Sequence, residues 1–282
     1  MSASAYPAEL EILPTDRPVS GTIAPPGSKS ITNRALVLAA LSSVRYPVTL
    51  DGALDSEDTR VMIEALRTLG YAVEPDWNLP RPTIQVRRGK KPVVPAERGD
   101  LFVANSGTTM RFLTAMVALG HGTYRLDGIP RMRERPIRDL LEALDQLGIA
   151  ATSEVGDGCP PVSIRGGTWR GGRVRIRGDV SSQFLSGLLL AAPFAPSTTT
   201  FEVEGGLVSR PYIEMTTRMM HIFHLRVSSP TPDSYLVPGD QEADGLPHGE
   251  YIVEPDASAA SYFFAAAAIT GGTVTVPGQT MR

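Results

Sequence analysis

The chain has 282 residues and a formal net charge of −3, with 27 lysines and arginines against 30 aspartates and glutamates. Nucleic-acid-binding proteins normally carry a surplus of cations for the phosphates, so this balance argues against nucleic acid as the main partner. A single cysteine, Cys159, excludes a disulfide framework. No apolar stretch is long enough to cross a bilayer and the first residues lack a signal-peptide pattern, so a cytoplasmic location is expected.

The first predicted helix starts in the segment PPGSKSITNR (residues 25–34), where a glycine turn leads into an apolar run at residues 35–41. Ser30 is the expected cap of this helix. The first N–H groups of a helix have no partner within it, and the helix dipole adds positive potential there. Together with Lys29 and Arg34, this helix end predicts an anion site. The alternative is a capped surface helix with incidental charges; a Walker A loop is excluded because its upstream glycine is missing.

The same design returns three more times along the chain. Polar residues that are expected to cap a helix recur about every 76 residues, a period long enough for a whole supersecondary unit. The four expected caps are Ser30, Thr108, Ser182 and Ser258. A second helix with apolar residues at helical spacing follows in each of the first three copies. These second helices are expected at residues 61–70, 140–148 and 213–225, and the first two end in a glycine that suits a helix C-cap.

Short β-branched or alternating runs surround these helices and are expected to be strands. They lie at residues 48–50, 83–86, 123–126, 162–164, 200–203 and 273–276. The predicted unit is therefore strand-helix-strand-helix-strand-strand, in a fold of the α/β (α+β) class. Three complete copies occupy residues 21–239, and a fourth begins near residue 250 and stops after one helix and one strand. The chain is expected to be a fragment or the product of a gene that ends early.

A second group of cations precedes the second helices. The segment PRMRERP (residues 130–136) places three arginines before a helix start, where they oppose the helix dipole unless an anion joins them. Arg131 and Arg133 fit a solvated loop equally well. The proline that follows Arg135 fixes the turn there and favours a functional side chain. His221 and His224 stand three residues apart without a third ligand nearby, so no metal site is expected.

Several segments, taken in order, resemble the 5-enolpyruvylshikimate-3-phosphate synthase family of enolpyruvyl transferases. The matching segments are PGSKS with TNR (residues 26–34), NSGTTMR (105–111), RMRERP (131–136), SSQ (181–183), SRPY (209–212) and PDA (255–257). The family fold has two domains of three such units each, arranged around pseudo-threefold axes. The resemblance implies a complete three-unit domain at residues 21–243 and part of a second domain at residues 1–20 and 244–282. At the observed period, six units need about 450 residues.

The resemblance implies an activity. The family transfers the enolpyruvyl group of phosphoenolpyruvate to the 5-hydroxyl of shikimate 3-phosphate and releases phosphate, in the shikimate pathway of chorismate and aromatic amino-acid biosynthesis. It implies no metal and no organic cofactor. The implied partners are the two small anionic substrates, with neither nucleic acid nor a membrane, and the complete protein is expected to be a monomer. A cleft lined by helix N-termini, lysine and arginine would hold both anions against their repulsion.

The resemblance also assigns roles to individual residues. Shikimate 3-phosphate is expected to contact Lys29, Ser30, Arg34, Ser181, Ser182, Gln183, Ser209, Tyr212 and Asp256. Phosphoenolpyruvate is expected to contact Lys29, Gly107, Arg135 and Gln183. Asp256 would accept the proton of the 5-hydroxyl as general base, and Lys29 would offset the charge that develops on the transferred group.

The chain departs from the family pattern beside this site. Phe112 stands where many members have proline, and Ser106 and Thr109 replace common alanines. The family's later arginine and lysine contacts to phosphoenolpyruvate lie beyond Arg282. Two alternatives stay open: a domain that binds shikimate 3-phosphate without catalysis, and a UDP-N-acetylglucosamine enolpyruvyl transferase of the same fold. The latter typically has a cysteine acid in the loop that here holds three arginines, and Cys159 lies too far along the chain to serve.

Overall fold

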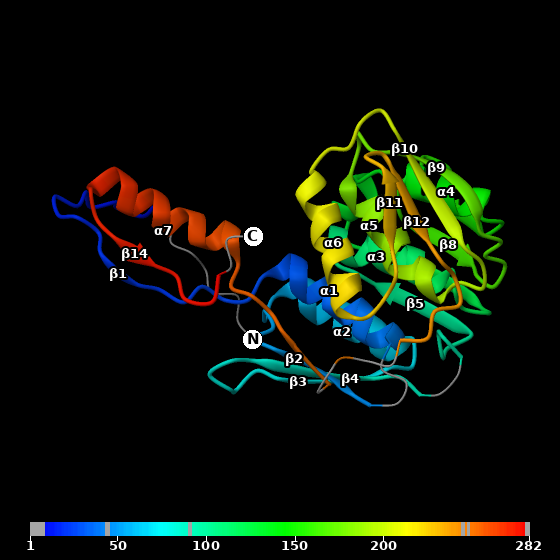
Figure 1. The fold of residues 1–282 in the computed structure, drawn as a ribbon, viewed down its shortest axis with the longest axis horizontal. Helices are drawn as coiled ribbons and strands as arrows, with labels where there is room; N and C mark the ends of the chain where they lie inside the picture. Colours follow the sequence, from blue (N-terminus) through cyan, green and yellow to red (C-terminus); the bar gives the residue numbers. More distant parts are fainter. Residues whose placement is uncertain (1–8, 43–45, 90–91, 244–245, 247–248, 280–282) are drawn as a thin grey trace. The chain divides into compact units, whose positions relative to one another are not determined.

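The computed structural model describes residues 9–42, 46–89, 92–243, 246 and 249–279 (Figure 1). The chain divides into two compact units. The large unit comprises Gly27–Glu254, and the small unit comprises Met1–Pro26 together with Pro255–Arg282.

Three four-stranded sheets form the β-structure of the large unit among its described residues. The first consists of β2 (Val48–Asp51), β3 (Ala72–Asp76), β4 (Thr83–Arg87) and β13 (Glu250–Ile252). The second consists of β5 (Arg98–Phe102), β6 (Thr123–Asp127), β7 (Ala150–Ser153) and β8 (Val162–Arg165). The third consists of β9 (Gly172–Arg177), β10 (Thr199–Glu204), β11 (Ser228–Thr231) and β12 (Ser234–Val237).

The three sheets share one topology. Their strand orders are β13-β2-β4-β3, β5-β6-β8-β7 and β9-β10-β12-β11. In each sheet the first two strands are parallel, and the remaining neighbours are antiparallel. The prediction of an α/β fold built from repeated strand-helix-strand-helix-strand-strand units is confirmed.

Each sheet is accompanied by two helices of different character. The first helices of the repeats are α1 (Lys29–Ser42), α3 (Gly107–Val117) and α5 (Ser182–Ala191), and the second helices are α2 (Glu57–Thr68), α4 (Arg138–Gln146) and α6 (Arg210–Ile222). The first helices are buried on nearly every side and pack on one another, which requires an apolar sequence all round. The second helices bury one face only. In Figure 1 the sheet of β2, β3 and β4 lies beneath α1 and α2.

The helix caps lie one or two residues before the predicted positions. Ser106 caps α3 by accepting from the N–H of Thr109 (3.3 Å), and Ser181 caps α5 by accepting from the N–H of Gln183 (3.2 Å). The predicted caps, which were wrong, instead lie in the first turns of their helices: Ser30, Thr108, Ser182 and Ser258. Each helix start has two or more polar residues within three positions, and only the backbone conformation decides which of them is the extended cap residue.

The helix ends follow the predicted pattern in two repeats and vary it in the third. Gly70 and Gly148 follow α2 and α4 with positive φ angles of 91° and 82°, as expected of C-cap glycines. The same position after α6 is held by His224, whose φ is 58°. The backbone of His224 thus takes the place of a glycine. Among the described residues, no group of three His, Cys, Asp or Glu side chains could hold a metal ion.

The first sheet is completed by a strand from the far end of the large unit. β13 runs parallel to β2, with Tyr251 opposite Leu50. In the other two repeats the equivalent strands, β5 and β9, directly precede their first helix. The start of the fourth repeat that was predicted near residue 250 is therefore the opening strand of the first repeat.

The small unit contains β1 (Gly21–Thr22), α7 (Ala257–Thr270) and β14 (Val274–Thr275). β1 and β14 pair in parallel, and the N–H of Val19 donates to Oγ1 of Thr270 (2.9 Å). These pairings, with that of β13, set the division of the chain at Pro26 and Glu254, whereas the sequence placed it at residues 20 and 243. Within the residues described here, no helix has both the length and the apolar character needed to cross a membrane.

Candidate functional site

A cavity of about 390 Å³ lies in the large unit, at the N-terminal ends of α1, α5 and α6. It is lined by Lys29, Ser30, Arg34, Thr108, Val180, Ser181, Ser182, Gln183, Val208, Ser209 and Tyr212. The lining includes all eight residues of the large unit that the sequence assigned to shikimate 3-phosphate, and they come from the first and third repeats. Thr108, Val180 and Val208 were not assigned to the ligand, because Thr108 has no assigned role in its motif and the two valines lie just before theirs.

Arg34 forms a buried wall of this cavity. Its side chain is in contact with water over only 2% of its surface. Nε donates to Oγ1 of Thr216 (2.8 Å), and Nη1 donates to the carbonyl oxygen of Ser30 (2.9 Å). Nη2 donates to Oγ of Ser186 (3.3 Å) and to the carbonyl oxygen of Tyr212 (3.4 Å). All of these acceptors are uncharged, so among the described residues no carboxylate neutralises the cation.

Two aromatic rings cover the same guanidinium group. Arg34 Cζ lies 5.1 Å from the ring centre of Phe112 and 5.7 Å from that of Tyr212. Burial lowers the pKa of Arg34 to about 10, although the nearby Tyr212 hydroxyl opposes that shift. The group is therefore still a cation at neutral pH. A desolvated cation held by neutral groups attracts an anion strongly.

The N-terminus of α5 supplies a second feature that suits an anion. Ser182 is largely buried, and Ser182 and Gln183 line the cavity in the first turn of the helix. The first N–H groups of a helix lack helical acceptors, and the dipole favours negative charge at this end. Ser181 accepts from two of them, through its hydroxyl from the N–H of Gln183 (3.2 Å) and through its carbonyl oxygen from the N–H of Phe184 (3.4 Å).

The start of α6 is strained at the cavity. Ser209 precedes the helix in a left-handed conformation (φ 55°), and its side chain makes no capping hydrogen bond. Such a conformation is unfavourable for a residue with a Cβ and persists where the surrounding structure imposes it, often at functional sites. The hydroxyl of Ser209 is thus held at the cavity without a capping role.

Lys29 has a carboxylate partner that the sequence did not reveal. Its Nζ lies 3.7 Å from Oδ2 of Asp58, at the start of α2. The hydroxyl of Ser106 donates to Oδ1 of the same aspartate (2.8 Å). Ser106 and Thr109 are the two hydroxyl residues that depart from the family pattern. Oγ of Ser106 lies 2.7 Å from Oγ1 of Thr109. Asp58 therefore links Lys29 to the N-terminus of α3.

The arginine-rich loop separates its three cations. Arg131 pairs with Glu134, and Arg133 makes a two-pronged ion pair with Asp127 (2.9 and 2.6 Å). Arg135 instead donates to the carbonyl oxygen of Asn105 (3.1 Å). It packs so closely on Gly107 that a Cβ there would clash with its guanidinium group. Arg135 and Gly107, both assigned to phosphoenolpyruvate, thus lie together at the N-terminus of α3.

A second buried arginine lies behind this loop. Arg111 in α3 is 4% exposed, and Nη2 donates to the carbonyl oxygen of Pro136 (2.8 Å). Burial and the neighbouring Arg135 lower its pKa to about 10, and Cys159 opposes this shift. Burial raises the pKa of the Cys159 thiol itself, as does Asp157, so the thiol stays protonated at neutral pH.

Asp256 belongs to the small unit. Its Oδ1 accepts from the N–H groups of Ser258 (2.8 Å) and Ala259 (3.1 Å), so that it caps α7. The second carboxylate oxygen, Oδ2, makes no further capping contact in the part of the chain that the structure describes. The capping role is one that the sequence had given to Ser258.

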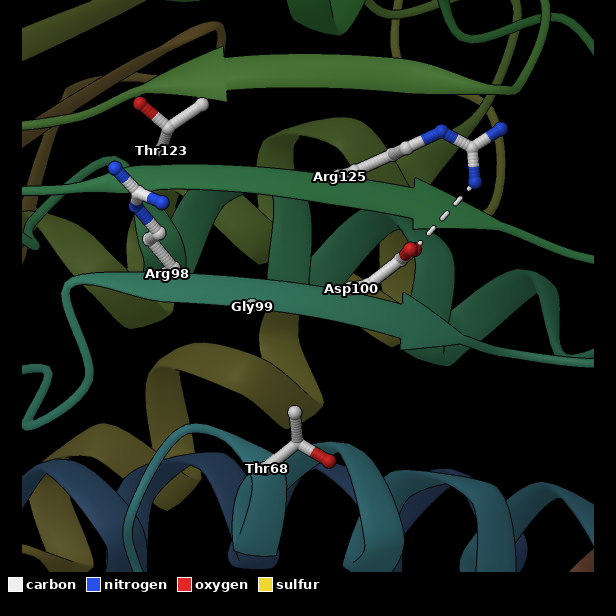
Figure 2. Close-up of a pocket in the computed structure, with 6 residues that line it drawn as sticks. All are labelled: Thr68, Arg98, Gly99, Asp100, Thr123 and Arg125. Carbon is white, nitrogen blue, oxygen red and sulfur yellow. Dashed lines mark hydrogen bonds and ion pairs between the residues drawn. The ribbon is translucent and has the colours of Figure 1, made fainter.

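Another hollow, of about 630 Å³, lies over β5 and β6 near the end of α2 (Figure 2). Its lining consists of Thr68, Arg98, Gly99, Asp100, Thr123 and Arg125. Arg125 contacts three carboxylates, those of Asp100 (3.4 Å), Asp127 (3.2 Å) and Glu154 (3.0 Å). Because these carboxylates match the charge of Arg125, this hollow suits an anion less well than the cavity at Arg34.

Known proteins resemble this chain over nearly all of its length. The family model described as EPSP synthase (3-phosphoshikimate 1-carboxyvinyltransferase) matches residues 14–282. The chain is similar to the 3-phosphoshikimate 1-carboxyvinyltransferase of Trichormus variabilis, with 46% identity over 261 residues, which are 93% of this chain and 59% of the relative. It is equally similar to the chloroplastic protein of that name from Solanum lycopersicum, with 46% identity over 285 residues, 99% of this chain and 54% of the relative.

A solved structure shows the same likeness in three dimensions. The EPSP synthase from Acinetobacter baumannii superposes with a TM-score of 0.79 at 26% identity, over 96% of this chain and 58% of that chain. The chain spans between about half and six tenths of the length of these proteins. Since the family model covers nearly all of its residues, the chain belongs to the EPSP synthase family.

Proposed function

We propose that the cavity at Arg34 binds shikimate 3-phosphate, and that the complete protein transfers the enolpyruvyl group of phosphoenolpyruvate to the 5-hydroxyl of that ligand. The observation that carries the proposal is a buried arginine that lines a polar cavity and contacts only uncharged acceptors. The hydroxyl groups of Ser30, Ser182 and Ser209 suit the hydroxyl and phosphate oxygens of a phosphorylated polyol.

In the proposed reaction, the 5-hydroxyl oxygen attacks C2 of phosphoenolpyruvate while the methylene carbon gains a proton from solvent, which balances the hydroxyl proton that passes to Asp256. The tetrahedral intermediate then loses that proton and inorganic phosphate, which restores the double bond. Asp256 accepts the hydroxyl proton, and Lys29 stabilises the negative charge on the transferred group. Gly107 and Arg135 hold phosphoenolpyruvate, and Gln183 contacts both substrates. No step requires a metal or an organic cofactor.

A test of the ligand compares shikimate 3-phosphate with unphosphorylated shikimate by calorimetry. Each charge-assisted hydrogen bond to the phosphate contributes roughly 1.5–3 kcal/mol, so the phosphorylated ligand should bind at least about tenfold more tightly. Equal affinities for the two ligands would refute the assignment of the cavity.

The second candidate function is binding without turnover, and the length of the chain relative to its relatives favours testing it separately. Release of phosphate that depends on both substrates would exclude it. In a protein that has the length of the relatives, Asp256→Asn should retain the α7 cap, since Asn also caps helices, while turnover falls by about 10²–10⁴-fold. A UDP-N-acetylglucosamine transferase is disfavoured, because residues 130–136 contain no cysteine where that enzyme typically has its cysteine acid.

A further inference from the structure

Two buried hydroxyl groups hold Arg34 from one side. Ser186 lies in α5 and Thr216 in α6, and neither side chain is exposed to water. Oγ1 of Thr216 accepts from Nε of Arg34 at 2.8 Å, and Oγ of Ser186 accepts from Nη2 at 3.3 Å. Neither hydroxyl lines the cavity, whereas Arg34 does. In Figure 1, α1 and α6 lie side by side, as this contact requires.

The two hydroxyls are themselves fixed in place. Thr216 Oγ1 lies 3.1 Å from Oγ of Ser186, and it donates to the carbonyl oxygen of Tyr212 one turn earlier in α6 (2.8 Å). That carbonyl oxygen also accepts from Nη2 of Arg34 (3.4 Å). A single threonine therefore connects the guanidinium group to the serine of α5 and to the first turn of α6.

The donors of Arg34 can be accounted for. A guanidinium group has five N–H donors in a fixed plane. Within the described part of the chain, four hydrogen bonds engage Nε, Nη1 and both donors of Nη2. One donor, on Nη1, is left for a ligand. Because the plane is rigid, fixing Nε and Nη2 also fixes the direction of that remaining donor.

Uncharged partners have a consequence that a carboxylate would not have. An aspartate at position 186 or 216 would hold Arg34 equally well, but it would neutralise the cation and compete with an anionic ligand. Hydroxyl groups orient the guanidinium group and leave its full charge available to the cavity. Orientation before binding removes part of the entropic cost of association.

We propose that Ser186 and Thr216 are positioning residues, which orient Arg34 toward the cavity without neutralising it and thereby raise the affinity of the site for its anionic ligand. The identity of that ligand as shikimate 3-phosphate rests on the proposed function. The orientation of Arg34 does not, since it follows from contacts within the protein.

The competing interpretation is that Thr216 merely fills space in the core. Two substitutions separate these roles. Thr216→Val keeps the size of the side chain and removes the hydroxyl, whereas Thr216→Ser keeps the hydroxyl and removes a methyl group. If Thr216 only fills space, Thr216→Ser should lower the affinity for the ligand more than Thr216→Val does. If Thr216 positions Arg34, Thr216→Val should lower that affinity more.

Calorimetric titration with shikimate 3-phosphate provides the first measurement. Thr216→Val should bind about tenfold more weakly than the unmodified chain, while Thr216→Ser should stay within about threefold of it. In an Arg34→Lys background, where no Nε exists, Thr216→Val should have almost no further effect. Equal affinity of the valine variant and the unmodified chain, or additive losses in the double variant, would overturn the proposal. Melting temperatures of all variants report whether they remain folded.

The second measurement needs no ligand. In a chain labelled with ¹⁵N-arginine, the Nε–H of Arg34 should exchange slowly with water, and Thr216→Val should accelerate this exchange at least about tenfold, with Thr216→Ser close to the unmodified chain. If the unmodified chain fails to bind shikimate 3-phosphate but shows this pattern, the proposed ligand is wrong and the positioning of Arg34 stands. If exchange is the same in all three chains, the positioning is wrong whatever the ligand.

Discussion

The first and second repeats each bury an arginine in their first helix, and the two arginines face different tasks. Arg34 in α1 and Arg111 in α3 are almost fully buried, and burial lowers the pKa of each to about 10. Arg34 lies over Phe112 of α3, and Arg111 lies over Phe184 of α5, at 5.1 and 5.9 Å from the ring centres. Only Arg34 lines the cavity.

The two arginines differ in the acceptors of their guanidinium N–H groups. Arg111 directs Nη2 at the backbone of Pro136 and Nη1 at the sulfur of Met132, and so anchors the arginine-rich loop. Arg34 is held by side-chain hydroxyls and backbone carbonyls around an open space. A buried arginine without a carboxylate is therefore not sufficient evidence of an anion site. The repeat supplies the same helical scaffold twice, and the neighbouring segments decide whether the cation supports structure or ligand.

The sharpest test of this comparison replaces each arginine with methionine. Arg34→Met should lower the affinity for shikimate 3-phosphate by about 100-fold or more, because it removes a charge-assisted contact and the charge itself. Arg111→Met should leave that affinity nearly unchanged while lowering the melting temperature. Calorimetry and thermal unfolding of both variants measure the two effects. Similar losses of affinity in the two variants would erase the distinction between the arginines.

A smaller effect is expected at the loop that Arg111 anchors. Gly107→Ala would place a methyl group against the guanidinium group of Arg135, which must then move. Loss of one charge-assisted hydrogen bond should weaken phosphoenolpyruvate binding about tenfold. Stability should change little, because the clashing atoms end a flexible side chain. The titration is made with shikimate 3-phosphate present, in a protein of the relatives' length. Unchanged phosphoenolpyruvate affinity would show that Arg135 is not a contact.

The paired arginines of the loop should affect stability rather than binding. Burial alone would raise the pKa of Asp127, but hydrogen bonds from Arg133, the Gly128 N–H and Arg125 outweigh it and hold the pKa below its ordinary value. A lowered pKa contributes stability above about pH 4 that is lost as the pH falls further. Asp127→Asn should therefore destabilise the chain by about 1 kcal/mol at pH 7 and by progressively less below pH 4.

Denaturant unfolding between pH 3 and pH 7 tests this pH dependence. Glu134→Gln, which removes the exposed partner of Arg131, is the matched control and should cost less than about 0.5 kcal/mol. If Asp127→Asn lowered the free energy of unfolding by the same amount at every pH, the ionic explanation would be wrong.

The smallest effect concerns the third repeat. His224 holds a left-handed conformation that glycine holds in the other two repeats. His224→Gly should stabilise the chain by about 0.5 kcal/mol, since relief of the conformational strain slightly exceeds the added entropy of the unfolded chain. Gly70→Ala should act in the opposite direction at the equivalent position, by about 1 kcal/mol. Thermal unfolding measures both, and a destabilised glycine variant would show that His224 makes contacts worth more than its strain.

The sequence predicted the helices of the repeats well because their signal is apolar spacing, which survives in every copy. The family resemblance assigned residues of the first and third repeats to one ligand, and these residues line one cavity. The sequence prediction missed β5, an edge strand whose residues are mostly exposed, with Leu101 buried among them. It also missed β9, in which Val174 and Ile176 are buried and alternate with exposed arginines.

The hydrogen-bond and ion-pair partners of the site residues could not be predicted from the sequence. Ser186 and Thr216 lie 152 and 182 residues from Arg34 along the chain. A serine or a threonine inside a helix gives no local sign that it accepts from a distant cation. Asp58 was similarly hidden, because an acidic residue in the first turn of a helix is already explained by the helix dipole. Only the packing of α1 against α5 and α6 brings these groups together.

The position of β13 has a consequence for synthesis of the protein. Thr49 of β2 precedes its partner, Glu250, by 201 residues. At a translation rate of about 5–20 residues per second, β2 leaves the ribosome roughly 10–40 s before the strand that covers its edge. An uncovered strand edge pairs readily with other chains. A nascent chain that has completed all three helix pairs of the large unit is therefore still open to aggregation at its first sheet, until β13 has also emerged from the ribosome.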